Sequence, residues 1–415
     1  MKLFMDYFQI NKNIINFNCS YGTVPKMVKE YQEKLLGECE SNPYEWFTKT
    51  YRYKLDVVRD QLSSFLHCQK CDMVFVDNTS SGANSVFNSI SFHKHSAIII
   101  LDIAYGLILN LANKMNKLTG CHIHTIFVDI REINDLPNQI SNAIDMLKMK
   151  NYQVDLVCCD HISSCPGILL PVKDIAKACL LNNVPLLVDA AHAIGQVEIN
   201  LDELGKHGVR YWVTDCHKWF FSPKGAALLW VHKEKQDNVF PVIDCATIGT
   251  KGCITENNSL QLSDFESRFL YLGTKDYTPW LSVQKAIYFV ELMGGYSYII
   301  KRNRDFTLKA QEKLCLSLNT QSPFCEDTIV SMINVPLPEC LSNSLIASRL
   351  MKELKESYKI YVVIYEYPCD SSNFYLRLCT QLFIQDEEID CLTKAIQIYS
   401  HECFMDDGQI AIGNS

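Results

Sequence analysis

The chain has 415 residues, 48% of them hydrophobic and 21% charged, as in a globular protein with room for more than one domain. Its 39 basic and 47 acidic residues give a net charge of −8, so no general attraction to nucleic acid or anionic membranes is expected. No stretch approaches a membrane span of ~20 apolar residues, and no signal peptide is visible. We therefore expect a soluble, cytoplasmic protein without nucleic-acid or membrane partners.

The 19 cysteines are numerous, but their number is odd and the chain is not small. Cys68 and Cys71 form a CxxC pair, and no second pair stands at the spacing of a zinc site. We predict that most of these cysteines are reduced structural thiols, and we expect no metal site.

Short apolar segments alternate with helical patterns over the first two thirds of the chain. The expected strands are Met73–Val76, Ala97–Leu101, Cys121–Val128, Val154–Cys159, Pro185–Val188, Arg210–Val213 and Ala226–Val231. Helical patterns begin near Gly82 and cover Pro137–Lys150 and Val172–Asn182. Continuous apolar strands separated by helices predict an α/β fold with a largely parallel sheet covered on both faces.

The pattern changes after about residue 290. Helices are expected over Tyr298–Leu318 and Ser344–Ser357, and strands near Ile329–Val335, Ile360–Tyr365 and Tyr375–Cys379. The predicted organisation is an N-terminal segment (1–25) packed on the small domain, a large domain (26–292), a small α+β domain (293–403) and a flexible tail (404–415).

Polar residues directly follow four of the predicted strands, at 78–81, 160–164, 189–192 and 215–218. Ligands of parallel α/β sheets bind outside the carboxyl ends of the strands, so these loops predict one shared site. Asp189 ends one buried strand and Lys218 follows another. Such a pair suits a cofactor that forms an imine with the lysine amine and has its ring nitrogen held protonated by the carboxylate.

Longer motifs extend this pair into a family resemblance. VDAAHAIGQ (residues 188–196) and DCHKWFFSPKGAALLWV (215–231) resemble the class V aminotransferase family of fold-type I pyridoxal-phosphate enzymes. FNCSYGTVPKMV, NPYEWF, NTSSGAN, LDIAYG, CCDHISSCPGILLPV and FLYLGTKDYTPWL extend the similarity over most of the chain. Within this family the chain is similar to the branch of isopenicillin-N epimerases, plant cysteine desulfhydrases and hercynylcysteine sulfoxide lyases of ergothioneine synthesis. The resemblance implies a mainly parallel, seven-stranded-type sheet and pyridoxal 5'-phosphate as cofactor.

The resemblance also assigns roles to single positions. Lys218 matches the Schiff-base lysine, Asp189 the partner of the pyridinium nitrogen, and His192 the contact to the phenolic oxygen. Further matches are phosphate contacts at Ser80 and Ser81, a phosphate or lysine-positioning contact at His217, a phosphate ligand donated across a homodimer interface at Thr274, and a substrate contact at Arg377. His161 ends a strand at the same edge and is a candidate cofactor contact, and Tyr21 of the N-terminal segment is expected in the wall of the substrate pocket.

Two departures from the family pattern affect substrate handling. Many relatives carry a histidine on the ring face near Ile103, where this chain offers only Ile103 and Tyr105. Asp215 stands where relatives commonly have asparagine, and a carboxylate beside a phosphate is unfavourable unless it points away.

The residues leave the reaction open among several outcomes. The resemblance favours a C–S β-lyase that acts on a cysteine derivative and gives pyruvate and ammonia. Epimerisation or racemisation and transamination are the alternatives. A cysteine desulfurase is less favoured, because residues 372–379 offer no cysteine on a Gly/His-flanked loop, and Cys379 reads as a strand-core residue. A catalytically inactive scaffold would have no need to keep Lys218, Asp189 and His192 together.

Overall fold

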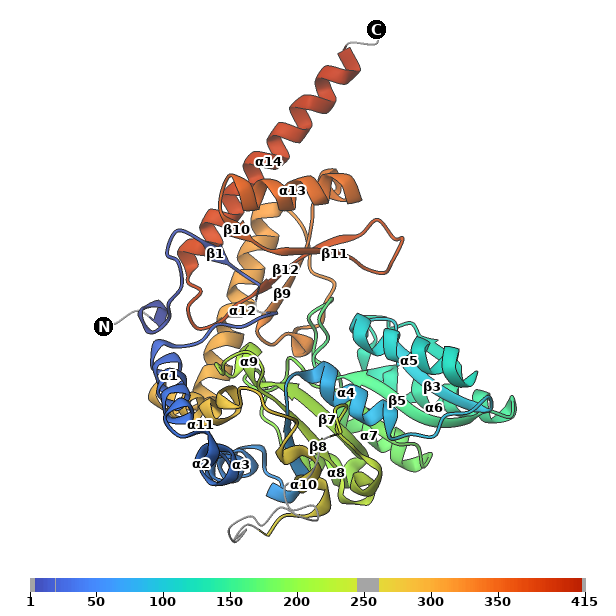
Figure 1. Ribbon diagram of the computed structural model, residues 1–415. Helices are drawn as coiled ribbons and strands as arrows, with labels where there is room; N and C mark the ends of the chain where they lie inside the picture. The colour runs from blue at the N-terminus through green and yellow to red at the C-terminus, as the bar shows by residue number, and fades with distance from the viewer. Residues whose placement is uncertain (1–3, 19, 245–260, 413–415) are drawn as a thin grey trace. The chain divides into compact units, whose positions relative to one another are not determined.

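The computed structural model describes residues 4–18, 20–244 and 261–412, with residues 402–412 described by their backbone alone. The chain divides into two compact units (Figure 1). Unit 1 comprises residues 1–21, 165–169 and 296–415, and unit 2 comprises residues 22–164 and 170–295. Each unit is considered by itself below.

Unit 2 is built on a seven-stranded sheet. Its strands are β2 (Met73–Val76), β3 (Ser96–Leu101), β4 (His122–Ile126), β5 (Gln153–Asp160), β6 (Leu186–Asp189), β7 (Val209–Asp215) and β8 (Ala227–Val231). Their order is β2-β8-β7-β6-β5-β3-β4. Only β8 runs against the others, since both of its pairings are antiparallel and the remaining pairings are parallel. The seven predicted strands and the largely parallel sheet are therefore confirmed.

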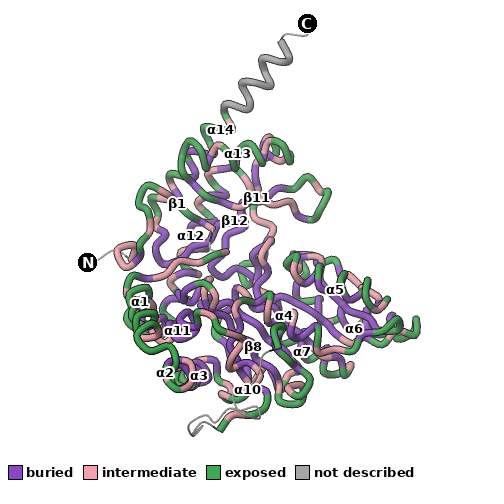
Figure 2. The backbone as a smooth tube through the Cα atoms, viewed as in Figure 1, coloured by how far each residue is buried: buried purple, intermediate pink, exposed green. Residues whose placement is uncertain are grey.

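Helices flank this sheet because most of its strands are buried on both faces, whereas β4 is only half-buried. The helices of unit 2 are α1 (Lys26–Ser41), α2 (Pro43–Glu45), α3 (Tyr51–Leu66), α4 (Thr79–Asn88), α5 (Gly106–Thr119), α6 (Leu136–Met149), α7 (Val172–Leu181), α8 (Leu201–His207), α9 (Cys216–Trp219), α10 (Asp264–Leu270) and α11 (Thr278–Leu292). Apolar residues of α4, α5 and α10 form one core cluster with alternate strand residues such as Ile98, Ile100 and Leu187. Helices α6, α7 and α8 pack against one another and against β5, β6 and β7. Figure 2 shows β8 as buried, whereas β4 is mostly half-buried.

Unit 1 is a smaller α+β assembly. Its elements include β1 (Ile15–Asn16), α12 (Tyr296–Leu318), β9 (Met332–Pro336), α13 (Ser344–Glu356), β10 (Ile360–Tyr361), β11 (Val363–Glu366), β12 (Phe374–Cys379) and α14 (Asp386–Ile412). The order β11-β12-β9 is antiparallel, and β1 of the N-terminal segment pairs with β10 in parallel. The strand predicted over 360–365 is divided here into β10 and β11.

The C-terminal backbone continues as α14 to Ile412, into the region where the sequence predicts a flexible tail. Residues 413–415 of that predicted tail lie outside the described residues. Within the ranges given above, no helix is both long and apolar enough to span a membrane. The cytoplasmic location remains a prediction.

Candidate active site

The carboxyl ends of β2, β5, β6 and β7 lie at one edge of the sheet, because these four strands share one direction. The four polar loops singled out in the sequence therefore leave the sheet together. Side chains alternate between the faces of a strand, so residues two apart share a face. Cys158, Leu187 and Val213 belong to the core cluster under α4 and α5. Asp160, Asp189 and Asp215, each two residues further on, therefore end three neighbouring strands on that same face.

Lys218 lies on the short helix α9, directly after β7. Its Nζ is 3.1 Å from Oδ2 of Asp215. The other oxygen of that carboxylate, Oδ1, accepts a hydrogen bond of 2.8 Å from the backbone N–H of Thr79 at the start of α4. Asp215 thus faces an ammonium group and a helix N-terminus, both of which favour its negative charge. The carboxylate therefore lies at the helix N-terminus that also contains the predicted phosphate contacts and does not point away from it.

Asp189 ends β6 and is 4% exposed. Burial raises the pKa of its carboxyl to about 6, while the N–H of Ala191 (3.0 Å) and the charge of Lys218 act in the opposite direction. A buried carboxylate of this kind gains free energy from a cation placed against it. Asp189 is therefore suited to holding a protonated ring nitrogen.

Two buried histidines near this edge are oriented by tryptophan indoles. Trp219 donates from Nε1 to Nδ1 of His192 at 3.0 Å, and Trp212 donates to Nδ1 of His161 at 3.3 Å. Because Nδ1 accepts in both rings, each ring carries its hydrogen on Nε2. Burial lowers the pKa of His161 to about 4, so this ring is neutral. His192 can donate from Nε2 to an oxygen acceptor, as its predicted role requires.

The N-terminus of α4 contains the predicted phosphate contacts. Asn78 caps the helix, and its side chain accepts from both the N–H and the hydroxyl of Ser81, at 2.8 and 3.1 Å. Ser80 is exposed, and the buried hydroxyl of Thr79 has no partner among the described residues. The first turn of this ten-residue helix thus offers hydroxyl groups beside backbone N–H groups that favour an anion.

His217 precedes Lys218 on α9 and is largely buried. Its Nδ1–H donates to the carbonyl of Ala226 at 3.1 Å, and its Nε2 lies 3.9 Å from Oδ1 of Asp215. Burial is the main cause that lowers the pKa of this imidazole. His217 is therefore suited to fix α9 in place as a neutral group, through its hydrogen bond to the carbonyl of Ala226.

The loop before α11 contains Thr274, whose exposed hydroxyl meets the hydroxyl of Tyr271 at 2.7 Å. Tyr277 holds the loop in shape by accepting from the N–H of Leu272 and donating to the carbonyl of Gly273, each at 2.7 Å. Lys275 forms an ion pair with Asp77, the residue that directly follows β2. The loop is thus ordered within one chain and presents Thr274 outward.

Two glycines allow backbone to approach α9 closely. A Cβ at Gly22, where φ is +58°, would lie 1.8 Å from the carbonyl oxygen of His217. A Cβ at Gly195 (φ +94°) would lie 2.5 Å from that of Trp219. Tyr21, the predicted substrate contact that precedes Gly22, belongs to unit 1 and is 73% exposed.

Arg377 lies in the middle of β12 in unit 1 and is 2% exposed. Its guanidinium donates to Oγ of Ser20 at 3.2 Å and to Sγ of Cys165 at 3.6 Å. The buried guanidinium, with its parallel N–H groups, is suited to bidentate recognition of a carboxylate.

Cys379, two residues after Arg377, is buried and bonded in a disulfide, which corrects the expectation of a reduced thiol at this position.

Several positioning residues escaped prediction from the sequence. Trp212 gave no chemical signal, because an apolar strand residue is common in any fold, and Asn78 was singled out only as part of the polar loop 78–81. Asp160 was noted only as part of a polar loop, yet it is 3% exposed and accepts from the N–H of Tyr105, the N-cap residue of α5. Of the two ring-face candidates, Ile103 is buried and Tyr105 is exposed.

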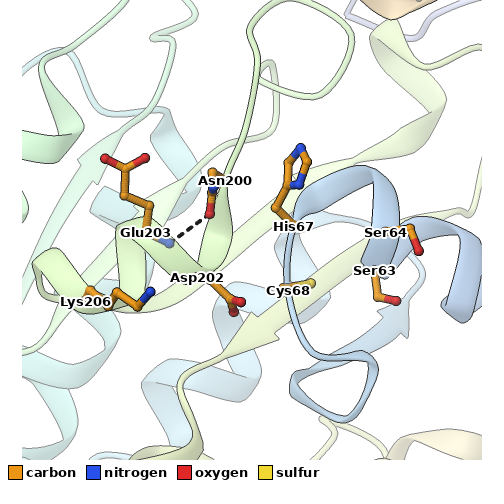
Figure 3. A pocket seen from close by; sticks show the side chains of 8 residues that line it. All are labelled: Ser63, Ser64, His67, Cys68, Asn200, Asp202, Glu203 and Lys206. Carbon is orange, nitrogen blue, oxygen red and sulfur yellow. Dashed lines mark hydrogen bonds between the residues drawn. The ribbon is translucent and has the colours of Figure 1, made fainter.

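A surface hollow of about 520 Å³ lies elsewhere on unit 2 (Figure 3). Its lining residues come from the end of α3 and the start of α8 and include His67, Cys68 and Asp202. None of the predicted site residues lines it. In the described part of the chain, no group of three or more His, Cys, Asp or Glu side chains is placed to hold a metal ion.

Comparison with known proteins adds independent information. The family model "Aminotransferase class-V" matches residues 22–363. A probable chloroplastic L-cysteine desulfhydrase of Arabidopsis thaliana is 26% identical over 94% of this chain and 82% of that protein. A hercynylcysteine sulfoxide lyase of Schizosaccharomyces pombe is 22% identical over 94% of this chain and 95% of that protein.

Solved structures show the same fold. The cystine C–S lyase C-DES, in complex with its reaction product cysteine persulfide, superposes with a TM-score of 0.75 at 19% sequence identity. The superposition covers 93% of this chain and 97% of that one. Another structure of C-DES has glycine covalently linked to its PLP cofactor. With the family model matched over most of its length, the chain belongs to the class V aminotransferase family of pyridoxal-phosphate enzymes.

Proposed function

We propose that this protein is a C–S β-lyase that cleaves a cysteine derivative with the help of pyridoxal phosphate. One observation carries the proposal: Lys218 and the buried carboxylate Asp189 follow neighbouring parallel strands at one edge of the sheet. The amine can form an imine with the aldehyde of this cofactor, and the carboxylate can pair with its protonated ring nitrogen.

The side chains present fit the cofactor. Lys218 would hold the cofactor covalently, and Asp189 would pair with its ring nitrogen. Burial disfavours the negative charge of Asp189, and the positive charge of the ring nitrogen would stabilise it. The phosphate would bind at the first turn of α4, where the buried hydroxyl of Thr79 has no partner among the described residues. Bound pyridoxal phosphate supplies an electron sink that stabilises negative charge at the α carbon of an amino acid.

The chain's own residues then handle protons and orientation. The Nζ of Lys218 is the base for the α proton, and Asp215 at 3.1 Å stabilises the ammonium that results. His192, in the orientation set by Trp219, would donate from Nε2 to an oxygen of the bound cofactor. Arg377 binds the substrate carboxylate through its buried guanidinium.

The substrate class rests on what the named relatives share. The cysteine desulfhydrase, the hercynylcysteine sulfoxide lyase and the cystine C–S lyase are all named for substrates that contain a cysteine unit. In the proposed reaction the α C–H and β C–S bonds break, and the sulfur leaves together with its substituent and takes up a proton. Water then releases ammonium and pyruvate.

We further propose a cytoplasmic homodimer in which Thr274 contributes to the phosphate site of the partner subunit.

An absorbance scan tests the proposal. Purified protein is scanned with pyridoxal phosphate before and after addition of cysteine, cystine and S-substituted cysteines, and pyruvate is assayed in the same cuvette. We expect a visible band that changes on addition, with pyruvate formed in proportion. Lys218→Ala should show neither. A band that changes without pyruvate would replace lyase activity with epimerisation or transamination, and the absence of any band would favour an inactive scaffold.

A further inference from the structure

Asp160 is a buried acid for which the mechanism above has no role. It ends β5, and its backbone pairs in register with that of Asp189 at the end of β6. Partners in a parallel pair project on the same face of the sheet, so the two carboxyl groups are neighbours. Both lie almost wholly out of solvent, with 3% and 4% exposure.

The two oxygens of Asp160 differ in their surroundings. The carboxyl accepts a hydrogen bond from the backbone N–H of Tyr105, whereas Oδ2 is buried and has no partner among the described residues. An unpartnered buried oxygen is costly, and more so when it carries negative charge. A proton on Oδ2 removes that charge and turns the oxygen into a donor.

Charge balance decides which of the two acids carries the proton. The charged groups that face this pair are Lys218 on α9 and Asp215 at the end of β7, and Lys218 is already 3.1 Å from Asp215. The buried thiol of Cys158 also lies near both acids and stays neutral, because burial raises its pKa. One shared cation cannot neutralise three carboxylates. Asp189 accepts the N–H of Ala191 and its pKa of about 6 leaves it ionised at neutral pH. Burial and the charge of Asp189 raise the pKa of Asp160 well above its ordinary value.

We propose that Asp160 is a neutral carboxylic acid that donates its O–H to the carboxylate of Asp189, and is thereby a positioning residue for the ring-nitrogen partner. The hydrogen bond restrains the rotamer of Asp189 and favours its ionised form. Through its second oxygen, the same carboxyl holds the N–H of Tyr105 at the start of α5. The effect on the cofactor rests on the function proposed above, but the location of the proton does not.

Two substitutions separate this role from simple packing. Asp160→Asn is neutral and keeps one donor and one acceptor, whereas Asp160→Leu is neutral, of similar size and has neither. We expect Asp160→Leu to lower kcat at least tenfold with KM changed less than threefold. Asp160→Asn should recover most of that loss. Because a neutral group replaces a neutral group, Asp160→Asn should also leave the pH dependence of the cofactor's visible band within about 0.3 unit.

Infrared spectroscopy of the cofactor-free protein at pH 7 locates the proton directly. We expect a carbonyl band of a protonated buried carboxyl that disappears in Asp160→Asn and persists in the surface control Asp129→Asn. A band that survives in Asp160→Asn, or a pH profile moved by more than one unit, would overturn the proposal. If the wild type binds no cofactor, the proposed function fails while the infrared result still decides the state of Asp160.

Discussion

At the scale of single side chains, Trp219 determines which nitrogen of His192 carries hydrogen. Trp219→Phe removes the 3.0 Å bond to Nδ1, so the ring can adopt its other tautomer. We expect turnover to fall about fivefold or more, since one such hydrogen bond is worth roughly 1 kcal/mol. Nitrogen NMR of His192 in the cofactor-free protein should show the tautomer change.

Trp212→Phe is the matched control, because it removes the corresponding bond to His161. If His161 has only a structural part, turnover stays within about twofold of the wild type while thermal stability falls. An equal loss of turnover in both variants would make His161 a cofactor contact, as its place at the end of a strand at this edge predicts. No change of tautomer in Trp219→Phe would contradict the role given to Trp219.

The raised pKa of Asp189 has a consequence for stability. The folded protein holds this proton more tightly than the unfolded chain, where the ordinary value is 3.8. The contribution to stability is therefore complete below pH 3.8 and is lost as pH rises through about 6. At 1.36 kcal/mol per pKa unit, this shift amounts to about 3 kcal/mol at most.

Asp189→Asn abolishes that dependence, so the variant of the cofactor-free protein should become more stable relative to wild type as pH rises from 4 to 7. Urea denaturation of both proteins at several pH values measures the difference. Parallel curves for the two proteins would show that Asp189 has an ordinary pKa. This outcome would also weaken the case for a cation held at this carboxylate.

At the scale of elements, the approach of the segment at Gly22 to α9 is set by backbone geometry. Gly22→Ala would place a Cβ 1.8 Å from the carbonyl oxygen of His217 in a backbone conformation with φ +58°. The segment and α9 must separate, which displaces Lys218. We expect a loss of stability of roughly 1–3 kcal/mol and at least a tenfold loss of activity.

Gly37→Ala is the control for this change, since Gly37 lies within α1 and a Cβ there meets nothing within 4 Å. Alanine favours a helix interior over glycine by about 0.5–1 kcal/mol, so this variant should be neutral or slightly more stable. Thermal melting and the cofactor band of both variants give the comparison. Unchanged activity in Gly22→Ala would show that α9 tolerates displacement.

Strand positions were predictable because most strands of the sheet are short, largely apolar segments bounded by polar residues. The spatial order was not, since nothing local in Ala227–Val231 shows that β8 inserts antiparallel between β2 and β7. The same limit applies to the site. Asp160 and Asp189 are neighbours because of the register between β5 and β6. That register cannot be predicted from the polar residue at the end of either strand.

At the scale of the whole molecule, the predicted exchange of Thr274 between subunits can be tested by mixing two damaged chains. Lys218→Ala lacks the lysine, and Thr274→Ala lacks the exposed hydroxyl. In a mixed dimer one site would combine Lys218 from one chain with Thr274 from the other, and the second site would have both defects. Random pairing makes half of the dimers mixed, each with one intact site, so co-expression should restore up to about a quarter of wild-type activity.

Each homodimer supplies the baseline for that experiment. Thr274→Ala alone should bind the cofactor more weakly, because a phosphate contact is lost, whereas Lys218→Ala alone should be inactive. Sedimentation at equilibrium confirms that mixed species form. If mixed dimers form and activity does not exceed the sum of the two homodimers, Thr274 acts within its own chain. The dimer would then be an association of independent sites, because neither subunit would complete the other.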